Sequence, residues 1–338
     1  MLLNIAAALV HHVQKKRERR RAFLENGGLV LEKLVASCNG RPFPIRTFSY
    51  QQLILATNNF NQILHRDAFY TLYKGSFEGR ILSIKMYDER DSSAKDTALM
   101  DIGISAKASA HKNVLKLVGC CLETSIPSLV FEYAQNGVLD RRIFISTRQG
   151  TPMLWQSRLK IARQFAHAIA YLHTAFFRPI IHADIKMKNI LLDQHDVPKL
   201  ADFSFSVSIP EGETHVQVDV VRGTGSFICP IYASTGRITE KTDVYNYGMV
   251  LLQILTGQRT IILDREDEDC SLPDHVRNRV INEIVDPAIL LEEGGAGLEP
   301  QLQAVLELGL TCTEYDPEIR PTMVDVTKEL RRIEKSVA

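Results

Sequence analysis

The spacing of the hydrophobic residues changes near residue 135 of the 338-residue chain. Before it, apolar residues gather in the short stretches "YTLYKGSFEG", "ILSIKMY", "VLKLVGCCLE" and "SLVFEYA", a pattern typical of β-strands. The first two predict a β-hairpin whose turn at 77–80 contains Gly79, and a weak helix is expected over 96–110. This part of the chain is therefore predicted to be a small, β-rich lobe.

Beyond residue 137 the apolar residues recur at helical spacing. The stretch "WQSRLKIARQFAHAIAYLHTAF" predicts one helix, and "TDVYNYGMVLLQILTG" predicts another that ends at Gly257. We expect a loop at "EEGGAGLEP", and final helices at "LQAVLELGLTCTE" and "MVDVTKELRRIEK". The prediction is an α+β fold: a basic segment over residues 1–44, a β-rich lobe over 45–134 and a larger helical lobe over 135–338.

Composition and charge narrow the class of protein. Forty lysines and arginines balance forty aspartates and glutamates, so no net charge favours nucleic acid or an acidic ligand. The cysteines show neither a CxxC pair nor a metal-ligand spacing; they are Cys38, Cys120, Cys121, Cys229, Cys270 and Cys312. We expect reduced, mostly buried thiols and a cytoplasmic protein.

The first twenty residues are unusual because an apolar run, "MLLNIAAALV", precedes the basic stretch "HHVQKKRERRR". The run is shorter than the roughly 20 residues that a membrane-spanning helix needs. A signal peptide would carry its positive charge before the apolar run. Three interpretations stay open: a solvated amphipathic helix, a peripheral contact with the anionic lipids of the plasma membrane, or the remnant of a transmembrane segment.

Five polar residues follow one another in an order typical of phosphoryl transfer. Lys85 ends the strand-like "ILSIK", Asp184, Lys186 and Asn189 lie within "HADIKMKN", and Asp202 begins "DFS". A kinase uses a strand lysine for the α- and β-phosphates, an Asp, Lys and Asn on one loop, and an Asp for the metal ion. Asp184 is thus the candidate proton acceptor, and Asn189 and Asp202 are the candidate Mg²⁺ ligands.

The chain resembles the eukaryotic protein kinase fold, of the wall-associated type of plant receptor-like kinases, over residues 45–336. The stretches "ATNNF", "NVLKLVGCCLE", "GVLD" and "ITEKTDVYNYGMVLLQILTG" carry this resemblance. The stretches "NGG", "LVASCNG", "PIRTFS", "YLHTAF" and "FSVSIPEG" make it similar to a narrower group, the short cytoplasmic pseudokinases of the ZED-related kinase family. The resemblance implies a bilobal kinase fold with a single domain.

The tripeptide "HRD" at 65–67 is not the catalytic loop. Alignment of "LYKG" with the end of the kinase glycine-rich loop puts the three glycine positions at His65, Asp67 and Tyr70. Glycines allow the backbone to approach the phosphates closely, whereas these side chains bring a ring and a carboxylate there. We therefore expect weak or absent binding of ATP and Mg²⁺, and no required cofactor.

Other positions also depart from the kinase pattern. An ungapped alignment puts Ile102 where kinases have the glutamate that holds the strand lysine. A substitute pair from the adjacent Asp101 is not expected, because neighbouring helix residues point about 100° apart. Ala183 replaces the arginine of the catalytic loop, and Ser204 replaces the glycine of the metal-binding motif.

A further change affects a buried ion pair of kinases. Ile231 replaces the glutamate that pairs with Arg320, so we predict that another acid or a backbone carbonyl receives this arginine. The retained catalytic-loop residues then have a structural explanation as well as a functional one, because their polar groups, tied to Asp243, can fold the loop.

The resemblance implies an adaptor or sensor in plant immunity rather than an enzyme. Members of this family bind the leucine-rich repeats of a coiled-coil NLR receptor and detect bacterial effectors, directly or through effector-modified active cytoplasmic kinases. A slow serine/threonine kinase that uses Lys85, Asp184, Asn189 and Asp202 is the alternative. A third hypothesis is a substrate or decoy modified at Thr214, Thr224 or Ser226, on a segment that we expect to be mobile and accessible.

Overall fold

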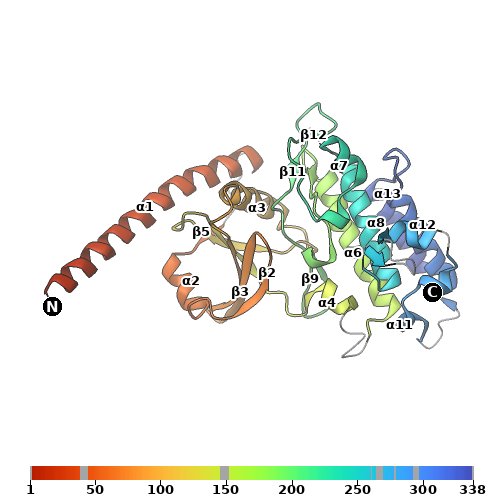
Figure 1. Cartoon of the computed structure of the whole chain (residues 1–338), viewed down its shortest axis with the longest axis horizontal. Helices are drawn as coiled ribbons and strands as arrows, with labels where there is room; N and C mark the ends of the chain where they lie inside the picture. Colours follow the sequence, from red (N-terminus) through yellow and green to blue (C-terminus); the bar gives the residue numbers. More distant parts are fainter. Residues whose placement is uncertain are drawn as a thin grey trace. The chain divides into compact units, whose positions relative to one another are not determined.

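The computed structural model describes residues 2–38, 45–144, 152–259, 261–263, 269–277, 279–291 and 297–336. The chain forms two compact units (Figure 1). The N-terminal unit consists of Met1–Ala110 and Leu115–Tyr133, and the C-terminal unit consists of His111–Val114 and Ala134–Ala338. The first is built on a sheet and the second mainly on helices, which agrees with the α+β fold expected from the sequence.

The N-terminal unit contains one six-stranded sheet, in the order β1-β5-β6-β4-β3-β2. Only the β1–β5 pair is parallel. The strands are β1 (Arg46–Thr47), β2 (Ile63–Arg66), β3 (Tyr70–Phe77), β4 (Arg80–Tyr87), β5 (Leu117–Cys121) and β6 (Ser128–Glu132), and the helices are α1 (Leu2–Cys38), α2 (Tyr50–Ala56) and α3 (Ala94–Ala108). None of the helices that the structure describes is long and apolar enough to cross a membrane.

The predicted hairpin is confirmed, and its turn fixes the register of the central strands. Glu78 and Gly79 both have positive φ, 49° and 74°, which is the conformation of the tight two-residue turns that join twisted antiparallel strands. The resulting register places Tyr70 opposite Tyr87, and Lys85 opposite a leucine of β3. The hairpin thereby holds Tyr70, at the third aligned glycine position, beside the strand that contains Lys85.

The core of this unit lies around the β1–β5 edge and β4, and is formed by Phe48, Leu53, Leu82, Ile84, Cys121 and Val130. Gly119 of β5 is part of the same packing. A Cβ atom there would lie 2.1 Å from the carbonyl oxygen of Arg46 and 2.6 Å from the Phe48 ring. Only glycine therefore allows β1 to approach β5 so closely.

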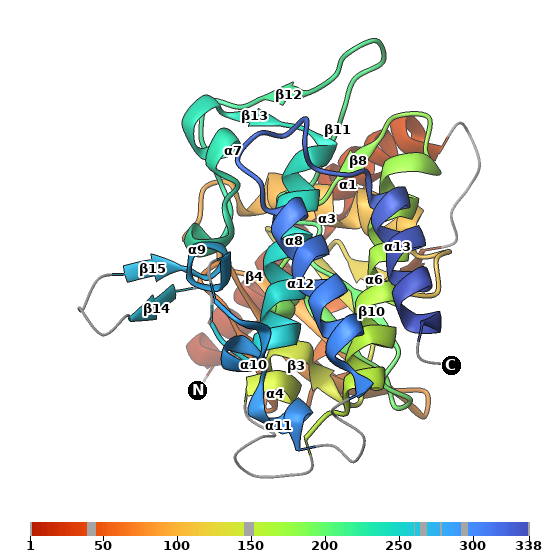
Figure 2. The ribbon, with the colours of Figure 1, turned by 90° about the vertical axis from the view of Figure 1, so that its right-hand side faces the viewer.

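Helices dominate the C-terminal unit, and four of them run side by side (Figure 2). The unit contains α4 (Leu139–Phe144), α6 (Trp155–Thr174), α7 (Pro230–Thr235), α8 (Glu240–Thr256), α9 (Leu272–Arg277), α10 (Ile281–Ile284), α11 (Pro287–Leu290), α12 (Glu299–Cys312) and α13 (Met323–Lys335). It also has strands β7 (Gly137–Val138), β8 (Ile180–Ile181), β9 (Ile190–Leu192), β10 (Pro198–Leu200), β11 (Val207–Ser208), β12 (Val216–Gln217), β13 (Arg237–Ile238), β14 (Ile261–Leu263) and β15 (Asp269–Ser271).

The long helices predicted from the sequence are confirmed as α6, α8, α12 and α13. A capping box at Thr239 begins α8, and Gly257 ends it in the left-handed region, with φ 63°. Of the predicted loop "EEGGAGLEP", residues 292–296 lie outside the described part of the chain, and its last two residues begin α12. Local signals of helix start and stop thus set most of these boundaries.

A buried arginine joins three segments of the C-terminal unit. The fully buried Arg158 of α6 donates to the carbonyl oxygens of Met153 and Ile254 and forms a 2.7 Å ion pair with Asp286. Asp286 also caps α11, because its other carboxylate oxygen accepts the N–H of Ala288. The charge of Arg158 is therefore neutralised by a residue that also begins a helix.

The first prediction concerns this pair. Asp286→Ala should lower the free energy of unfolding by about 3–5 kcal/mol, because it leaves the Arg158 guanidinium buried without a carboxylate. Urea denaturation followed by circular dichroism measures the change. Lys328→Ala, which breaks an exposed pair with Asp325, is the control and should leave the transition almost unchanged. Equal midpoints for the two variants would contradict the prediction.

Candidate functional site

Lys85 forms a buried ion pair within the N-terminal unit. Its ammonium lies 2.7 Å from Oδ2 of Asp101 on α3, and both side chains are almost completely buried. The same Oδ2 accepts a 2.8 Å hydrogen bond from the hydroxyl of Tyr87, and Oδ1 accepts one of 2.8 Å from Ser105. Both oxygens of the carboxylate are thus satisfied, which is the condition for a stable buried charge.

The expectation that Asp101 would not pair with Lys85 is wrong. The fully buried Ile102 packs in the apolar interior, and α3 turns Asp101 and Ser105, four residues apart, toward the strand lysine. The ungapped alignment assumed that α3 is rotated like the matching helix of other kinases, and in this chain it is rotated differently. If Ile102 faced Lys85, the lysine charge would be buried without a counter-ion. Rotation of α3 by one residue places the carboxylate of Asp101 there instead.

Tyr70 occupies the space beside the Lys85 ammonium. The ammonium lies 4.1 Å from the centre of the Tyr70 ring and 4.8 Å from that of Tyr87, both within the range of a cation–π interaction. The two rings contact each other edge to face at 6.1 Å. The third of the aligned glycine positions thus has a residue whose ring binds the lysine itself.

The rest of the degenerate loop uses its backbone donors internally. The N–H of Asp67 donates to the carbonyl oxygen of Tyr70 at 2.9 Å, and the N–H of Ala68 donates to the Asp67 carboxylate at 2.6 Å. That carboxylate lies 3.8 Å from Nε2 of His65. This part of the loop therefore presents a carboxylate and an imidazole at two of the aligned glycine positions, and the N–H groups of Asp67 and Ala68 are bonded within the loop.

The segment that contains the catalytic-loop residues lies in the C-terminal unit and is held in place by hydrogen bonds to one buried carboxylate. Asp243 of α8 accepts 2.8 Å hydrogen bonds from the N–H groups of His182 and Ala183, and its Oδ2 also lies 2.9 Å from Nε2 of His173. Ala183 is in the left-handed region, with φ 64°. The prediction that this loop is tied to Asp243 is confirmed.

The carboxylate of Asp184 is buried and already has partners. Oδ2 lies 2.7 Å from the Lys186 ammonium and accepts a 3.1 Å bond from Asn189, while Oδ1 accepts the hydroxyl and the N–H of Thr224 at 2.8 and 3.1 Å. The sequence placed Asp184, Lys186 and Asn189 together correctly. Sequence analysis did not find Thr224 as their partner, because it lies about forty residues further along the chain.

The expectation that Thr224 is an accessible hydroxyl is therefore wrong. Its Oγ1 accepts a 2.7 Å bond from Lys186 as well as donating to Asp184, so both hydrogen-bonding roles of the hydroxyl are used. Thr214 is exposed, as expected, and Ser226 is half-buried. Of the three candidate modification sites, Thr214 is the one that the structure leaves open to solvent.

The conformation of Asp202 is stabilised by another residue of the "DFS" motif. Its φ is 69°, and its Oδ1 accepts a hydrogen bond from the hydroxyl of Ser204, the residue at the lost glycine position. Asn189, the other candidate metal ligand, donates its amide N–H to Asp184. Among the described residues, no group of three or more His, Cys, Asp and Glu side chains is arranged to hold a metal ion.

Arg320 confirms a prediction made from the loss of its glutamate. Almost completely buried, it donates to the backbone carbonyl oxygens of Glu314, Tyr315 and Lys241, at 2.6, 3.0 and 3.1 Å. Its guanidinium also contacts Sγ of Cys229 at 3.1 Å. Three carbonyl dipoles thus replace the missing carboxylate, as predicted.

The cysteines whose surroundings the structure describes, Cys120, Cys121, Cys229 and Cys312, are all buried and unpaired, as expected. Burial raises the pKa of Cys120 to about 12, that of Cys121 to about 11 and that of Cys312 to about 12. These three are therefore protonated at neutral pH and unsuited to act as nucleophiles. The side chains of Cys38 and Cys270 lie outside the described part of the structure.

The second prediction tests the buried pair of the N-terminal unit. Asp101→Asn should lower the free energy of unfolding by about 3–5 kcal/mol, because the Lys85 charge then has no carboxylate. Asp96→Asn, on the exposed side of the same helix, should change it by less than about 1 kcal/mol. Urea denaturation compares the two. A loss of the same size in both variants would show that Lys85 does not depend on Asp101.

The sequence comparisons agree with this geometry. Residues 70–330 match the protein kinase domain family. The serine/threonine-protein kinase ZRK1 of Arabidopsis thaliana is 39% identical over 335 residues, which cover 96% of this chain and 95% of that protein. The non-functional pseudokinase ZED1 of the same plant is 40% identical over 333 residues, covering 95% of this chain and 99% of that protein.

A larger protein is also similar. Wall-associated receptor kinase-like 1 of Arabidopsis thaliana is 36% identical over 335 residues, covering 96% of this chain and 45% of that protein. The chain is thus similar both to short kinases and to a receptor-type kinase, as its sequence motifs indicated. The chain therefore belongs to the protein kinase family, among the ZED-related kinases and pseudokinases.

Proposed function

We propose that this protein is a catalytically impaired kinase that acts as an adaptor and sensor in plant immune signalling. The observation that carries the proposal is the Tyr70 ring on the Lys85 ammonium, 4.1 Å from ring centre to nitrogen. The ring and the buried ion pair with Asp101 together give the Lys85 ammonium its interaction partners inside the N-terminal unit. A lysine that is already paired and covered gains little from a phosphate and loses an aromatic contact on binding it.

Asp67 opposes nucleotide binding further. Two like charges 4 Å apart repel by about 4 kcal/mol at an effective dielectric constant of 20, which corresponds to about three decades in affinity. The nearby His65 imidazole does not cancel this repulsion when it is neutral. Steric and electrostatic obstacles thus lie at two of the three positions where kinases have glycine.

The surviving catalytic residues have a role in folding. Asn189 donates to the backbone and side chain of Asp184, which in turn accepts the N–H of Thr224. These bonds connect the catalytic loop with the segment that contains Thr224, whether or not phosphate is transferred. Retention of Asp184 and Asn189 is therefore consistent with a fold that is kept for its surfaces.

The partners follow from the family resemblance. We propose that the protein connects a coiled-coil NLR receptor with bacterial effectors or with effector-modified active cytoplasmic kinases. Two of the most similar proteins, ZED1 and ZRK2 of Arabidopsis thaliana, are described as non-functional pseudokinases. A surface that binds such partners needs a stable fold but no phosphoryl transfer.

A slow serine/threonine kinase is the second candidate. The Lys85–Asp101 pair supplies the ion pair that kinases normally make with a glutamate, and Asp184, Lys186 and Asn189 are gathered within hydrogen-bonding distance. ZRK1 and ZRK4, which are also similar, are described as serine/threonine-protein kinases. This candidate requires that the Tyr70 ring move away when ATP binds.

Calorimetry with Mg²⁺-ATP tests nucleotide exclusion. We expect no heat of binding at millimolar ATP for the wild-type protein, and measurable binding for the Tyr70→Gly, Asp67→Gly double variant, which removes the ring and the carboxylate. The double variant Ala68→Gly, Phe69→Gly is the matched control, because it also adds two glycines to the loop but leaves Asp67 in place and Tyr70 on Lys85. Micromolar binding by the wild type would overturn the exclusion of ATP.

A second variant separates the adaptor from the enzyme. Asp184→Ala removes the only candidate proton acceptor of the predicted catalytic set, so an enzyme would lose phosphoryl transfer to a peptide or to itself. An adaptor should show no transfer in either form and should keep its effector-dependent immune response in plants, provided that both proteins accumulate equally. ATP-dependent phosphorylation that disappears in Asp184→Ala would establish the kinase instead.

A further inference from the structure

Helix α1 is attached to the N-terminal unit by one side. The buried Asn26 donates its amide to the carbonyl oxygens of Leu122 and Thr124, at 3.1 and 2.9 Å. Val30, one turn further, is 7% exposed, and the Arg19 guanidinium lies 4.9 Å from the centre of the Tyr50 ring. Residues 19, 26 and 30 lie on the same side of a helix that turns 100° per residue, so these contacts fix how α1 is rotated.

The opposite side of α1 presents a stripe of aliphatic and arginine side chains to solvent. Residues 10, 13, 17, 20 and 24 follow one another at spacings of three and four, and therefore share this side. Val10 is 56% exposed, Val13 47% and Leu24 66%. We call these five residues, Val10, Val13, Arg17, Arg20 and Leu24, together with Arg21 at the edge of the same side, the outer stripe.

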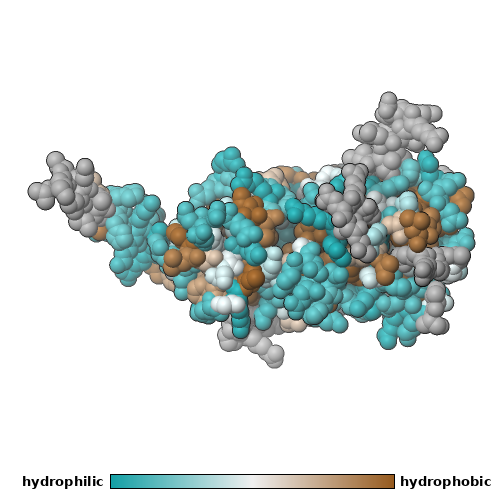
Figure 3. Space-filling view, turned by 90° about the horizontal axis from the view of Figure 1, so that it is seen from below, coloured by the Kyte–Doolittle hydropathy of each residue, from teal (hydrophilic) through white to brown (hydrophobic). Residues whose placement is uncertain are grey.

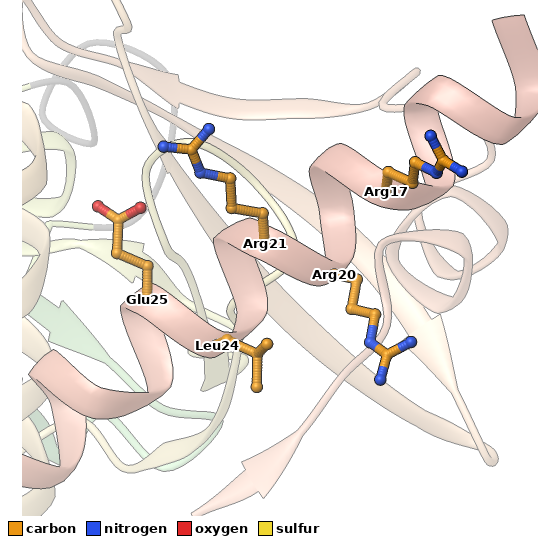
Figure 4. Close-up of a pocket in the computed structure, with 5 residues that line it drawn as sticks. All are labelled: Arg17, Arg20, Arg21, Leu24 and Glu25. Atoms are coloured by element: carbon orange, nitrogen blue, oxygen red, sulfur yellow. The ribbon is translucent and has the colours of Figure 1, made fainter.

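The arginines of the outer stripe surround Leu24. Figure 4 shows Arg20 and Leu24 projecting from one side of the helix, and Arg17 and Arg21 from the adjacent side. Together with Glu25 they line a shallow hollow. Glu25 is neutralised by Lys95, 2.6 Å away, and Arg17 and Arg20 form no ion pair within the described part of the chain. Their charges are thus available to a ligand.

The chain before this stripe is apolar. "LLNIAAALV" at 2–10 belongs to the same helix and has no charged residue, and "KKRERRR" at 15–21 follows after the four residues "HHVQ". In Figure 3 the described part of α1 beyond the grey residues is hydrophilic, with apolar atoms beside it. Helices that lie in a lipid interface combine apolar side chains with lysines and arginines, and α1 contains both.

We propose that the outer stripe of α1 docks on an anionic membrane surface. The arginines would bind lipid phosphates, for which a planar guanidinium is well suited, and their aliphatic stems with Val10, Val13 and Leu24 would enter the interface. Asn26 holds the helix to the segment that follows β5, and Glu25 pairs with Lys95 of α3, so the stripe faces the membrane as a rigid element. This inference does not depend on the exclusion of ATP.

An acidic membrane fits better than an acidic soluble protein. A protein groove would need a specific shape, whereas a leaflet accepts scattered aliphatic residues and any cation that lies within about 8 Å at physiological salt. Each arginine or lysine near such a surface strengthens binding about fivefold. Three arginines therefore account for about a hundredfold.

Sedimentation with lipid vesicles tests the proposal on the full chain. We expect binding to phosphatidylcholine vesicles that contain 30% phosphatidylserine, weak binding to phosphatidylcholine alone, and a decrease with added salt. Arg17→Gln, Arg20→Gln, Arg21→Gln should bind about a hundredfold more weakly. Arg80→Gln, Arg178→Gln, Arg331→Gln removes the same charge from three exposed arginines elsewhere and should bind within about threefold of wild type.

Two results would overturn the proposal. One is the absence of vesicle binding by the wild type at low salt, which would leave a soluble acidic partner as the occupant. The other is an equal loss in both triple variants, which would mean that only net charge matters. Insertion is measured separately with Val13→Trp: the natural Trp155 is fully buried, so a blue shift of the added fluorescence on anionic vesicles supports the proposal and an unshifted spectrum contradicts insertion of the stripe.

Discussion

A single charged group buried in the sheet, the ammonium of Lys85, determines the arrangement of the N-terminal unit. A buried ammonium must have a counter-ion, and this requirement explains why α3 presents Asp101 rather than Ile102. It also explains why Ser105 and Tyr87 donate to the same carboxylate, because each remaining lone pair needs a donor. The Tyr70 ring then completes the surroundings of the charge. The lysine that kinases use for phosphate is thus bound by residues of its own unit.

The C-terminal unit also buries charged side chains, and it provides them with different partners. Arg158 is neutralised by a carboxylate, whereas Arg320 relies on backbone carbonyl oxygens. Asp243 accepts backbone N–H groups from the loop that contains Asp184. Because these residues determine the conformation of the loop, their identities are constrained even without catalysis. Intact catalytic-loop residues are for this reason weak evidence of activity.

Sequence patterns predicted what depends on local chemistry. The tight turn at Gly79, the end of α8 at Gly257 and the order of Lys85, Asp184 and Asp202 could all be recognised from residue types and spacing. The partner of Lys85 could not, because an alignment without gaps does not give the rotation of a helix. The sequence signal for the correct rotation is Ser105, four residues after Asp101 and therefore on the same side. The bond from Thr224 to Asp184 joins distant segments and has no local signature.

The contact between Tyr70 and Lys85 has a consequence for how such a protein responds to its cell. Active kinases sample different arrangements as nucleotide comes and goes, so their shape is coupled to the supply of ATP. Under the proposed exclusion of nucleotide, a chain that fills this position with its own tyrosine would lack this coupling. Its surfaces would stay the same in starved and well-fed cells, and a receptor that monitors them would respond to chemical attack on the protein rather than to metabolism.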